Sequence, residues 1–231
     1  MRKAIITFGT IGIILCAVFA LRPIVNMFVG NPGLRTASIS TGGDPATTDM
    51  NGSWVIIPGQ DANQSQVGYT FHEVLPAGAK ETSGRADNHK EQNIKGHVTV
   101  HDDVLTEAVV SVRVDGISSD VEKRDINVRK KILETQEFPE ASFTLTDPVD
   151  VSSLPKDGTT GEIAATGDLY IHGQTKQVTA TFKVLRTGDN VVLSANIPFN
   201  RLDFGVKTPE FVAAKIEEQG TLDVLLVLQK S

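Results

Sequence analysis

The sequence predicts an all-β protein, an extended antiparallel β-barrel of eight strands with one or two short helices, preceded by an apolar N-terminal membrane helix. Apolar and polar residues alternate with a period of two in several segments, β-branched residues and glycine are abundant, and no long amphipathic helix pattern occurs. A strand with one apolar face must hide that face, and closure into a barrel also removes the sheet edges. A β-sandwich fits the same periodicity and stays open as an alternative.

The N-terminal segment predicts a membrane anchor. Residues 4–21 carry no charge, follow the basic start Arg2-Lys3, and are continued by apolar residues up to position 29. Such a segment is long enough to cross a bilayer as a helix with its basic end in the cytoplasm. We therefore expect residues 1–29 to form a signal anchor in the cell membrane, with the rest on the extracytoplasmic side. Cleavage after Ala20 and secretion is the alternative, whereas the bulky Leu15 disfavours lipoprotein processing at Cys16.

Residues 30–51 are rich in Gly, Ser, Thr and Pro, and they predict a flexible linker. The whole chain has 22 basic and 28 acidic residues, of which residues 1–47 hold four and one. The remaining 18 basic and 27 acidic residues give a net charge of −9. An acidic domain without a cationic stripe excludes nucleic acid as the expected partner. Since Cys16 is the single cysteine, the domain expected over residues 52–231 has no disulfide.

The barrel domain is expected to contain about eight strands. A first strand starts at Trp54, a weaker one follows, and polar loops are expected over residues 76–92 and 147–160. Residues 201–216 are expected to be irregular or helical. In order, the nine segments that supply these strands are 54–58, 66–74, 94–100, 108–114, 143–145, 161–171, 175–185, 191–199 and 222–228.

The clearest element is a β-hairpin over residues 161–185. Ile163, Ala165, Gly167, Leu169 and Ile171 share one face, and polar residues from Glu162 to His172 share the other. After His172-Gly173-Gln174 the alternation restarts, with Val178, Ala180, Phe182 and Val184 on the apolar face. Two alternating segments around a short turn with glycine predict an antiparallel hairpin. We expect His172 to be solvated in this turn.

Residues 121–136 break the alternation and predict a short amphipathic helix. Ile126, Arg129 with Lys130, and Leu133 have helical spacing, and Phe138-Pro139 should end the helix. The pairs Arg124-Asp125 and Arg201-x-Asp203 place opposite charges at junctions between strands and irregular segments. They are interpreted as surface ion pairs, with closure of the barrel end as the alternative.

Small residues share the expected inner face with Val, Leu and Phe, and they decide whether the barrel is hollow. They are Gly68, Gly96, Ala108, Ala165, Gly167 and Ala180. A barrel of eight strands is just wide enough to be filled by side chains or to hold one small ligand. Composition alone supports a ligand cavity and a filled core equally.

The sequence shows no catalytic or metal motif, so we expect no enzyme, no cofactor and no metal. His97 and His101 are about 13 Å apart if they lie on one strand, too far to share a metal. Nucleophile elbow, zinc-protease and phosphate-loop motifs are absent. Two alternatives stay open. One is a hydrolase using the His101-Asp102-Asp103 cluster, and the other is a protein-interaction module with a filled barrel and an exposed apolar patch.

Three stretches resemble the YceI-like family, which is also described as lipid- or polyisoprenoid-binding. They are Arg124-Asp125 with the following helix and Glu137 to Phe143, Gly167 to Thr175, and Asn200 to Val206, within a match from about Trp54 to Leu228. The resemblance implies an extended, lipocalin-like antiparallel barrel with a long apolar tunnel, in an exported protein that binds a polyprenyl or similar amphiphilic lipid. It also implies no shared catalytic set. The polar loops at residues 77–92 and 147–160, and the N-terminal anchor, depart from the family pattern.

The resemblance favours the cavity over the filled core, and it implies that inward-facing residues bind the ligand. Arg124 and Arg201 are the candidates for contacts with a polar headgroup at the mouth. The sequence does not name the lipid, and a homodimer stays open. The expected apolar contacts are Val110, Val112, Phe143, Leu169, Ala180, Phe182 and Val224.

Overall fold

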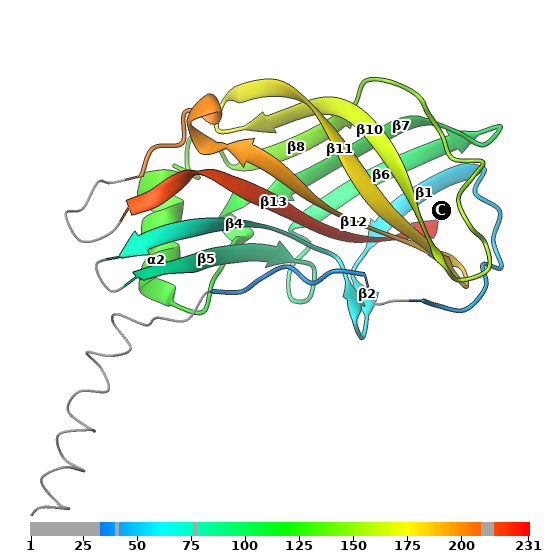
Figure 1. Cartoon of the computed structure of the whole chain (residues 1–231), viewed down its shortest axis with the longest axis horizontal. Helices are drawn as coiled ribbons and strands as arrows, with labels where there is room; N and C mark the ends of the chain where they lie inside the picture. Colours follow the sequence, from blue (N-terminus) through cyan, green and yellow to red (C-terminus); the bar gives the residue numbers. More distant parts are fainter. Residues whose placement is uncertain (1–32, 40–41, 76–77, 209–214) are drawn as a thin grey trace, which may run out of the picture.

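The structure is a computed structural model that describes residues 33–39, 42–75, 78–208 and 215–231 (Figure 1). Within these residues the chain forms one antiparallel sheet that closes on itself, and the ring contains eight strands. The pairing of β1 with β13 completes the ring, with Trp54 opposite Lys230. The prediction of an all-β, eight-stranded antiparallel barrel is confirmed, and a sandwich is excluded. The ring strands are β1 (Gly52–Ile57), β6 (Ile94–His101), β7 (Val104–Arg113), β8 (Glu140–Leu145), β10 (Thr160–Ile171), β11 (Gln174–Thr187), β12 (Asn190–Asn200) and β13 (Lys215–Lys230).

Strand β13 is long enough to pair with two different strands along one of its edges. Its last residues pair with β1, and residues 215–225 pair with β4 (Gln66–Leu75). Strands β1 and β4 therefore follow one another along β13, separated by the small hairpin of β2 (Gly59–Gln60) and β3 (Asn63–Gln64). Strand β4 pairs in turn with β5 (Gly78–Asp87), which extends the barrel wall beyond β1 and β6.

The free side of β5 is covered by the segment that follows β7. Arg85 and Ser118 exchange two backbone hydrogen bonds of 2.9 and 3.0 Å. A single turn η1 (Val114–Gly116) precedes this bridge, and the helix α2 (Glu122–Asn127) follows it. The helix continues as the wider turns of η2 (Val128–Ile132) and stands across one end of the barrel (Figure 1). This end is called the α2 end below.

The predicted helix over residues 121–136 is confirmed, but it ends at Ile132, before Phe138-Pro139. Glu134 adopts a left-handed φ of 45°, which the helix cannot continue through. The buried Asp125 fixes the start of α2, because its carboxylate accepts hydrogen bonds from the Ser119 backbone N–H at 2.8 Å and the Ser119 hydroxyl at 2.6 Å.

The prediction of a loop over residues 76–92 is wrong, because residues 78–87 form β5. This strand pairs with β4 along the whole length of β4. Thr82 and Ser83 are buried in β5, so polar side chains occupy positions where an apolar alternation was sought. The last strand also begins earlier than predicted, at Lys215 instead of 222. Between β12 and β13, residues 201–204 form the short 3₁₀ helix η3 (Arg201–Phe204), which agrees with an irregular or helical segment.

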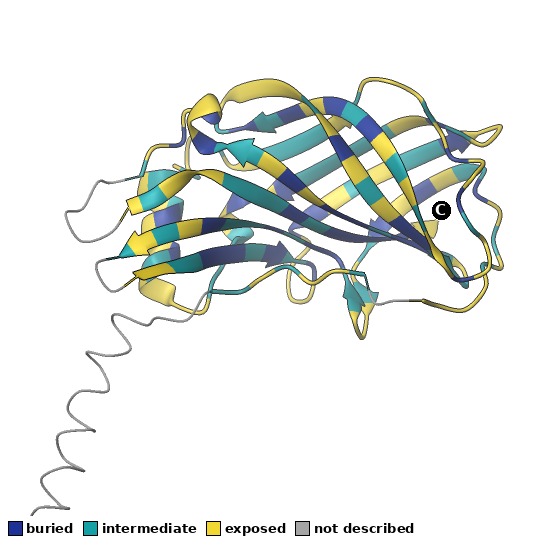
Figure 2. Cartoon of the chain, in the orientation of Figure 1, coloured by how far each residue is buried: buried dark blue, intermediate teal, exposed yellow. Residues whose placement is uncertain are grey.

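The predicted hairpin is confirmed as β10 and β11, with Ile163 opposite Phe182 and Ile171 opposite Gln174. His172 and Gly173 form its two-residue turn with φ values of 50° and 76°. Positive φ at both positions defines the turn that matches the twist of paired strands. Buried and exposed residues alternate along these strands in Figure 2, as expected for a wall with one wet face.

The described residues before β1 lie against the barrel. Gly33 forms a bridge with Ser83 of β5, and Ala46 forms one with Gly188 at the turn between β11 and β12. Thr47 donates to Asp189, and Met50 is buried in the main core. These contacts lie in the segment predicted as a linker. The predicted anchor of residues 1–29 lies outside the described residues, and no helix inside them has the length and apolar character to cross a membrane.

Candidate functional site

The barrel interior contains a cavity of about 510 Å³, lined almost entirely by apolar side chains. Strands β4, β6, β7, β8, β10, β11, β12 and β13 all contribute to its wall. A cavity of about 150 Å³ is already enough to bind benzene in an engineered protein, and ligand pockets commonly measure about 300–1,000 Å³. The volume therefore suits an apolar ligand of considerable size.

The end of the cavity opposite α2 is sealed. Trp54 is 2% exposed, and its indole N–H donates to the Met50 carbonyl oxygen at 2.8 Å. The loop after β9 (Val149–Asp150) was predicted to be polar, but it places Val151 and Leu154 in the core at this end. The lining residues here are all buried, namely Met50, Trp54, Val100, Leu105, Val151, Leu154, Leu226 and Leu228.

The middle of the cavity is lined by apolar side chains that remain only partly buried. In a packed core these inward-facing residues would be fully covered, so their residual exposure marks the empty space. The rings of Phe143 and Phe182 face each other here, with centroids 6.3 Å apart. The partly buried lining residues include Val98, Ala108, Val110, Phe143, Phe182, Leu193 and Val224.

Polar lining residues gather at the α2 end. Asn127 of α2 is exposed to solvent and also lines the cavity, which places the opening beside this helix. The cavity thus changes from an apolar, closed end to a polar mouth along the barrel. The polar residues of the mouth are Tyr69, Glu73, Arg124, Asn127, Ser142, Arg201 and Thr208.

Tyr69 gives a pH test of this geometry. Burial raises the pKa of its phenol to about 12 from an ordinary 10.0, with a smaller opposing effect of Arg124 and a raising effect of Asp125. Because the unfolded chain ionises first, stability should be lost as the pH rises from 10 through 12. Thermal melts against pH, with the phenolate absorbance as a second readout, check this. A Tyr69→Phe variant should lack that component of the loss, and an identical pH profile for both proteins would contradict it.

Arg201 ties the turn after β12 to the start of β13. Its buried guanidinium donates to the carbonyl oxygens of Val206 at 2.9 Å, Glu217 at 3.2 Å and Ile216 at 3.3 Å. These bonds hold the mouth in shape. Arg124 of α2 lies 3.1 Å from the carboxylate of Asp120, which is two residues before the helix begins. Contact of either arginine with a headgroup stays a prediction.

Eight of the nine predicted ligand-binding residues line this one cavity, although no bound ligand tests their role. Ala180 is the exception, because it is buried against Ala195 and Ile197 and does not line the cavity. The residues that do line it are Val110, Val112, Phe143, Leu169, Phe182, Val224, Arg124 and Arg201.

The small-residue interpretation is correct for Ala108 and Ala165, and it is wrong for Ala180, Gly96 and Gly167. Ala108 and Ala165 line the cavity. At Gly167 the Phe143 ring occupies the place of a side chain, and at Gly96 the Ile56 side chain and the Val109 carbonyl do so. These glycines allow neighbours to approach closely and leave no free volume.

His172 is not solvated, contrary to the prediction. Its side chain is 10% exposed, its ring packs on Phe138 with centroids 4.3 Å apart, and Nε2 lies 3.1 Å from the Glu134 carboxylate. The turn of the β10–β11 hairpin is thereby joined to the residues that follow η2. A turn histidine gives no sequence signal of such a contact, which depends on a segment far away in the chain.

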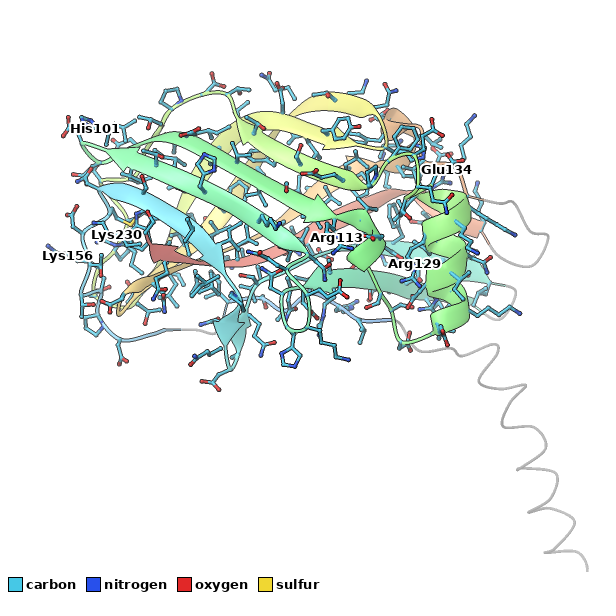
Figure 3. All side chains as sticks on the ribbon, turned by 180° about the vertical axis from the view of Figure 1, so that it is seen from behind. His101, Arg113, Arg129, Glu134, Lys156 and Lys230 are labelled. Atoms are coloured by element: carbon cyan, nitrogen blue, oxygen red, sulfur yellow. The ribbon has the colours of Figure 1, made fainter. Side chains whose placement is uncertain are left out.

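The groups that suggested catalysis lie outside the cavity. His101 and Asp102 are 78% and 89% exposed in the turn between β6 and β7, at the end opposite α2 (Figure 3). His97 meets Glu107 on the outer wall, with Nε2 and Oε1 3.1 Å apart. In the part of the chain that the structure describes, no three His, Cys, Asp or Glu side chains gather as metal ligands.

A closed antiparallel barrel with an apolar cavity that opens at one end defines a β-barrel of the small-ligand-binding type. The family model of the YceI-like domain matches residues 59–228, and the chain belongs to this family. The resemblance noted in the sequence is therefore confirmed.

Two solved structures share the fold at low sequence identity. BcnA of Burkholderia cenocepacia is 18% identical with a TM-score of 0.55, and the match covers 71% of this chain and 95% of BcnA. A polyisoprenoid-binding domain from Saccharophagus degradans, implicated in plant cell wall breakdown, is 14% identical with a TM-score of 0.55. That match covers 72% of this chain and 98% of the domain. None of the curated proteins matches the sequence.

Proposed function

We propose that the chain is an exported, membrane-tethered binding protein that holds a polyisoprenoid or a similar long-chain amphiphilic lipid in the barrel cavity. The observation that carries the proposal is the polarity of the cavity, with a sealed apolar end at Trp54 and a polar mouth at α2. An amphiphilic chain fits this gradient with its hydrocarbon inside and its headgroup at the mouth. The similarity in fold to a domain described as polyisoprenoid-binding supports the same ligand class.

Hydrocarbon burial alone supplies enough free energy for this function. Each methylene transferred from water contributes about 0.8 kcal/mol. At about 0.3 kcal/mol per heavy atom for a large ligand, roughly 27 buried atoms reach micromolar affinity. No covalent or acid–base chemistry is required, and the cavity lining supplies Glu73, Tyr69 and two arginines as its ionisable groups. We therefore propose a binding protein and no enzyme.

Export and tethering rest on the predicted anchor of residues 1–29, whose uncharged segment is long enough to cross a bilayer as a helix. The rival hypothesis of a protein-interaction module requires a filled barrel, which a cavity of about 510 Å³ does not support.

Native mass spectrometry of the protein purified from cells, followed by lipid extraction, tests the proposal. We expect one lipid per chain, and we expect a fluorescent polyprenyl probe to bind competitively after delipidation. A protein that carries no lipid and binds no probe would require another function for the cavity.

A further inference from the structure

Exposed apolar side chains collect at the mouth of the cavity. Among the described residues, five large hydrophobic side chains are strongly exposed, and four of them lie at the α2 end. Val121 and Ile126 belong to the start and the middle of the helix, and the others lie at the end of β4 and in η3. The fifth, Val55, lies on β1 in the opposite half of the barrel. The four are Val74 at 47%, Val121 at 40%, Ile126 at 41% and Leu202 at 43%.

The same helix presents positive charge in an acidic domain. Lys123, Lys130 and Lys131 are exposed, and Arg129 is partly exposed at this end (Figure 3). Of the nearby acidic groups, Asp120 pairs with Arg124, Asp125 is buried by Ser119, and Glu134 pairs with His172, whereas Glu122 and Glu137 are exposed. The exposed Asp203, Glu217 and Glu218 belong to η3 and β13, and they outnumber the exposed Lys207 and Lys215 in the same part of the chain. The excess of positive charge at this end therefore lies on the helix, within residues 121–132.

We propose that this surface, made of Val121, Lys123, Ile126, Lys130 and Lys131 and called the α2 face, docks on a bilayer that contains anionic lipid. The inference rests on the proposed function and specifies where the lipid is exchanged. Apolar side chains that enter the headgroup region, flanked by lysines that meet anionic headgroups, are the combination that holds a helix at a membrane surface.

The position of the mouth favours a bilayer as the occupant. Arg124, Asn127 and Val128 of the same helical segment line the cavity, so a docked α2 face brings the opening to the lipid surface. A lipid that crossed water would expose its chain, at a cost of about 0.8 kcal/mol for each methylene. Docking at the mouth removes that barrier.

The length of chain before the barrel leads to the same orientation. The predicted anchor ends at residue 29, and Gly33 is already bridged to Ser83 on β5. Residues 30–32 span at most about 10 Å when extended. The neighbouring Arg85 is bridged to Ser118, three residues before Val121. A tether this short holds the β5 and α2 side of the barrel against the membrane.

Quenching by lipid tests the docking in the full chain. A fluorophore is attached to the cysteine of an Ile126→Cys variant in which Cys16→Ser removes the native thiol. The protein is reconstituted in phosphatidylcholine vesicles that contain brominated lipid as the quencher. The vesicles are made either with or without phosphatidylglycerol. Strong quenching is expected at position 126 in the anionic vesicles, reduced by high salt. A label on Val55→Cys serves as the distant control and should remain unquenched.

Charge reversal supplies the matched comparison. Each cation near an anionic surface raises the affinity for that surface roughly fivefold. A triple variant that combines Lys123→Glu, Lys130→Glu and Lys131→Glu should therefore lower the quenched fraction at least tenfold. Lys95→Glu with Lys156→Glu and Lys183→Glu makes the same charge change on the walls and far end, and should leave the quenching unchanged.

Equal quenching at positions 126 and 55 in every vesicle, or equal effects of the two triple variants, would overturn the docking and leave a protein partner as the occupant of this face. Equilibrium binding of a polyprenyl probe to the same variants in detergent separates the two proposals. If the wild-type protein does not bind the probe, the proposed function is contradicted. The docking proposal is judged only by the fluorescence quenching in vesicles.

Discussion

An Ala108→Phe substitution is expected to remove most lipid binding while the barrel stays at least as stable as before. Ala108 is partly buried and lines the middle of the cavity, so an added phenyl ring enters empty space. Displacing roughly six ligand carbons at about 0.3 kcal/mol each weakens binding by ~2 kcal/mol, and further misplacement of the chain adds to the loss. Titration with a fluorescent polyprenyl probe and thermal unfolding of the delipidated protein measure the two effects.

The matched control is the same change at Ala180. This alanine is buried among Ala195 and Ile197 and does not line the cavity, so Ala180→Phe should overpack the wall and cost about 1–3 kcal/mol of unfolding free energy. If Ala108→Phe destabilises the protein as much as Ala180→Phe and leaves probe binding intact, the interior is solid and the lipid-binding proposal fails.

Truncating Trp54 to alanine is expected to have the largest effect on stability. Trp54 is almost fully buried at the sealed end, and Trp→Ala substitutions in cores cost about 3–5 kcal/mol. The Met50 carbonyl oxygen also loses its hydrogen bond from the indole. In a domain of this size such a loss lowers the melting temperature by roughly 10 °C. Urea and thermal unfolding followed by circular dichroism, which does not depend on the tryptophan, measure it.

Trp54→Phe separates the two parts of this effect. It loses the hydrogen bond but keeps most of the apolar volume, so we expect a cost of about 1–3 kcal/mol. Equal and small costs for the alanine and phenylalanine variants would show that this end of the barrel is not held closed by the tryptophan.

The sequence identifies the strands whose two faces meet different surroundings. In β10 and β11 one face meets the core or the cavity and the other meets water, and their alternation was found without error. Strand β5 was missed for the opposite reason. Its buried positions hold the polar residues Thr82 and Ser83, so its sequence shows no apolar alternation with a period of two. Its partners are β4 on one side and the bridge from Arg85 to Ser118 on the other.

The candidate site divides in the same way. Inward orientation is a property of the strand itself, and it placed Val110, Phe143 and Phe182 on the cavity wall. Free volume depends on what the opposite wall contributes, and the sequence cannot specify this. Phe143 occupies the space beside Gly167, and the neighbours of Ala180 close the space beside it. The same limit concealed the contact between His172 and Glu134, which lie 38 residues apart.

The double pairing of β13 has a consequence for the timing of folding during protein synthesis. Strands β12, β4 and β1 all hydrogen-bond to β13, and β13 is the last element of the barrel to leave the ribosome. Strand β4 lacks a partner on that edge until residues 215–225 have been made, and β1 lacks one until residues 227–230 have been made. Closure joins segments 170 or more residues apart in sequence. Contacts of such high order form slowly, so the nascent chain stays open throughout its synthesis. An open chain is the form that a narrow secretion channel can accept, so this order of folding would suit the export proposed above.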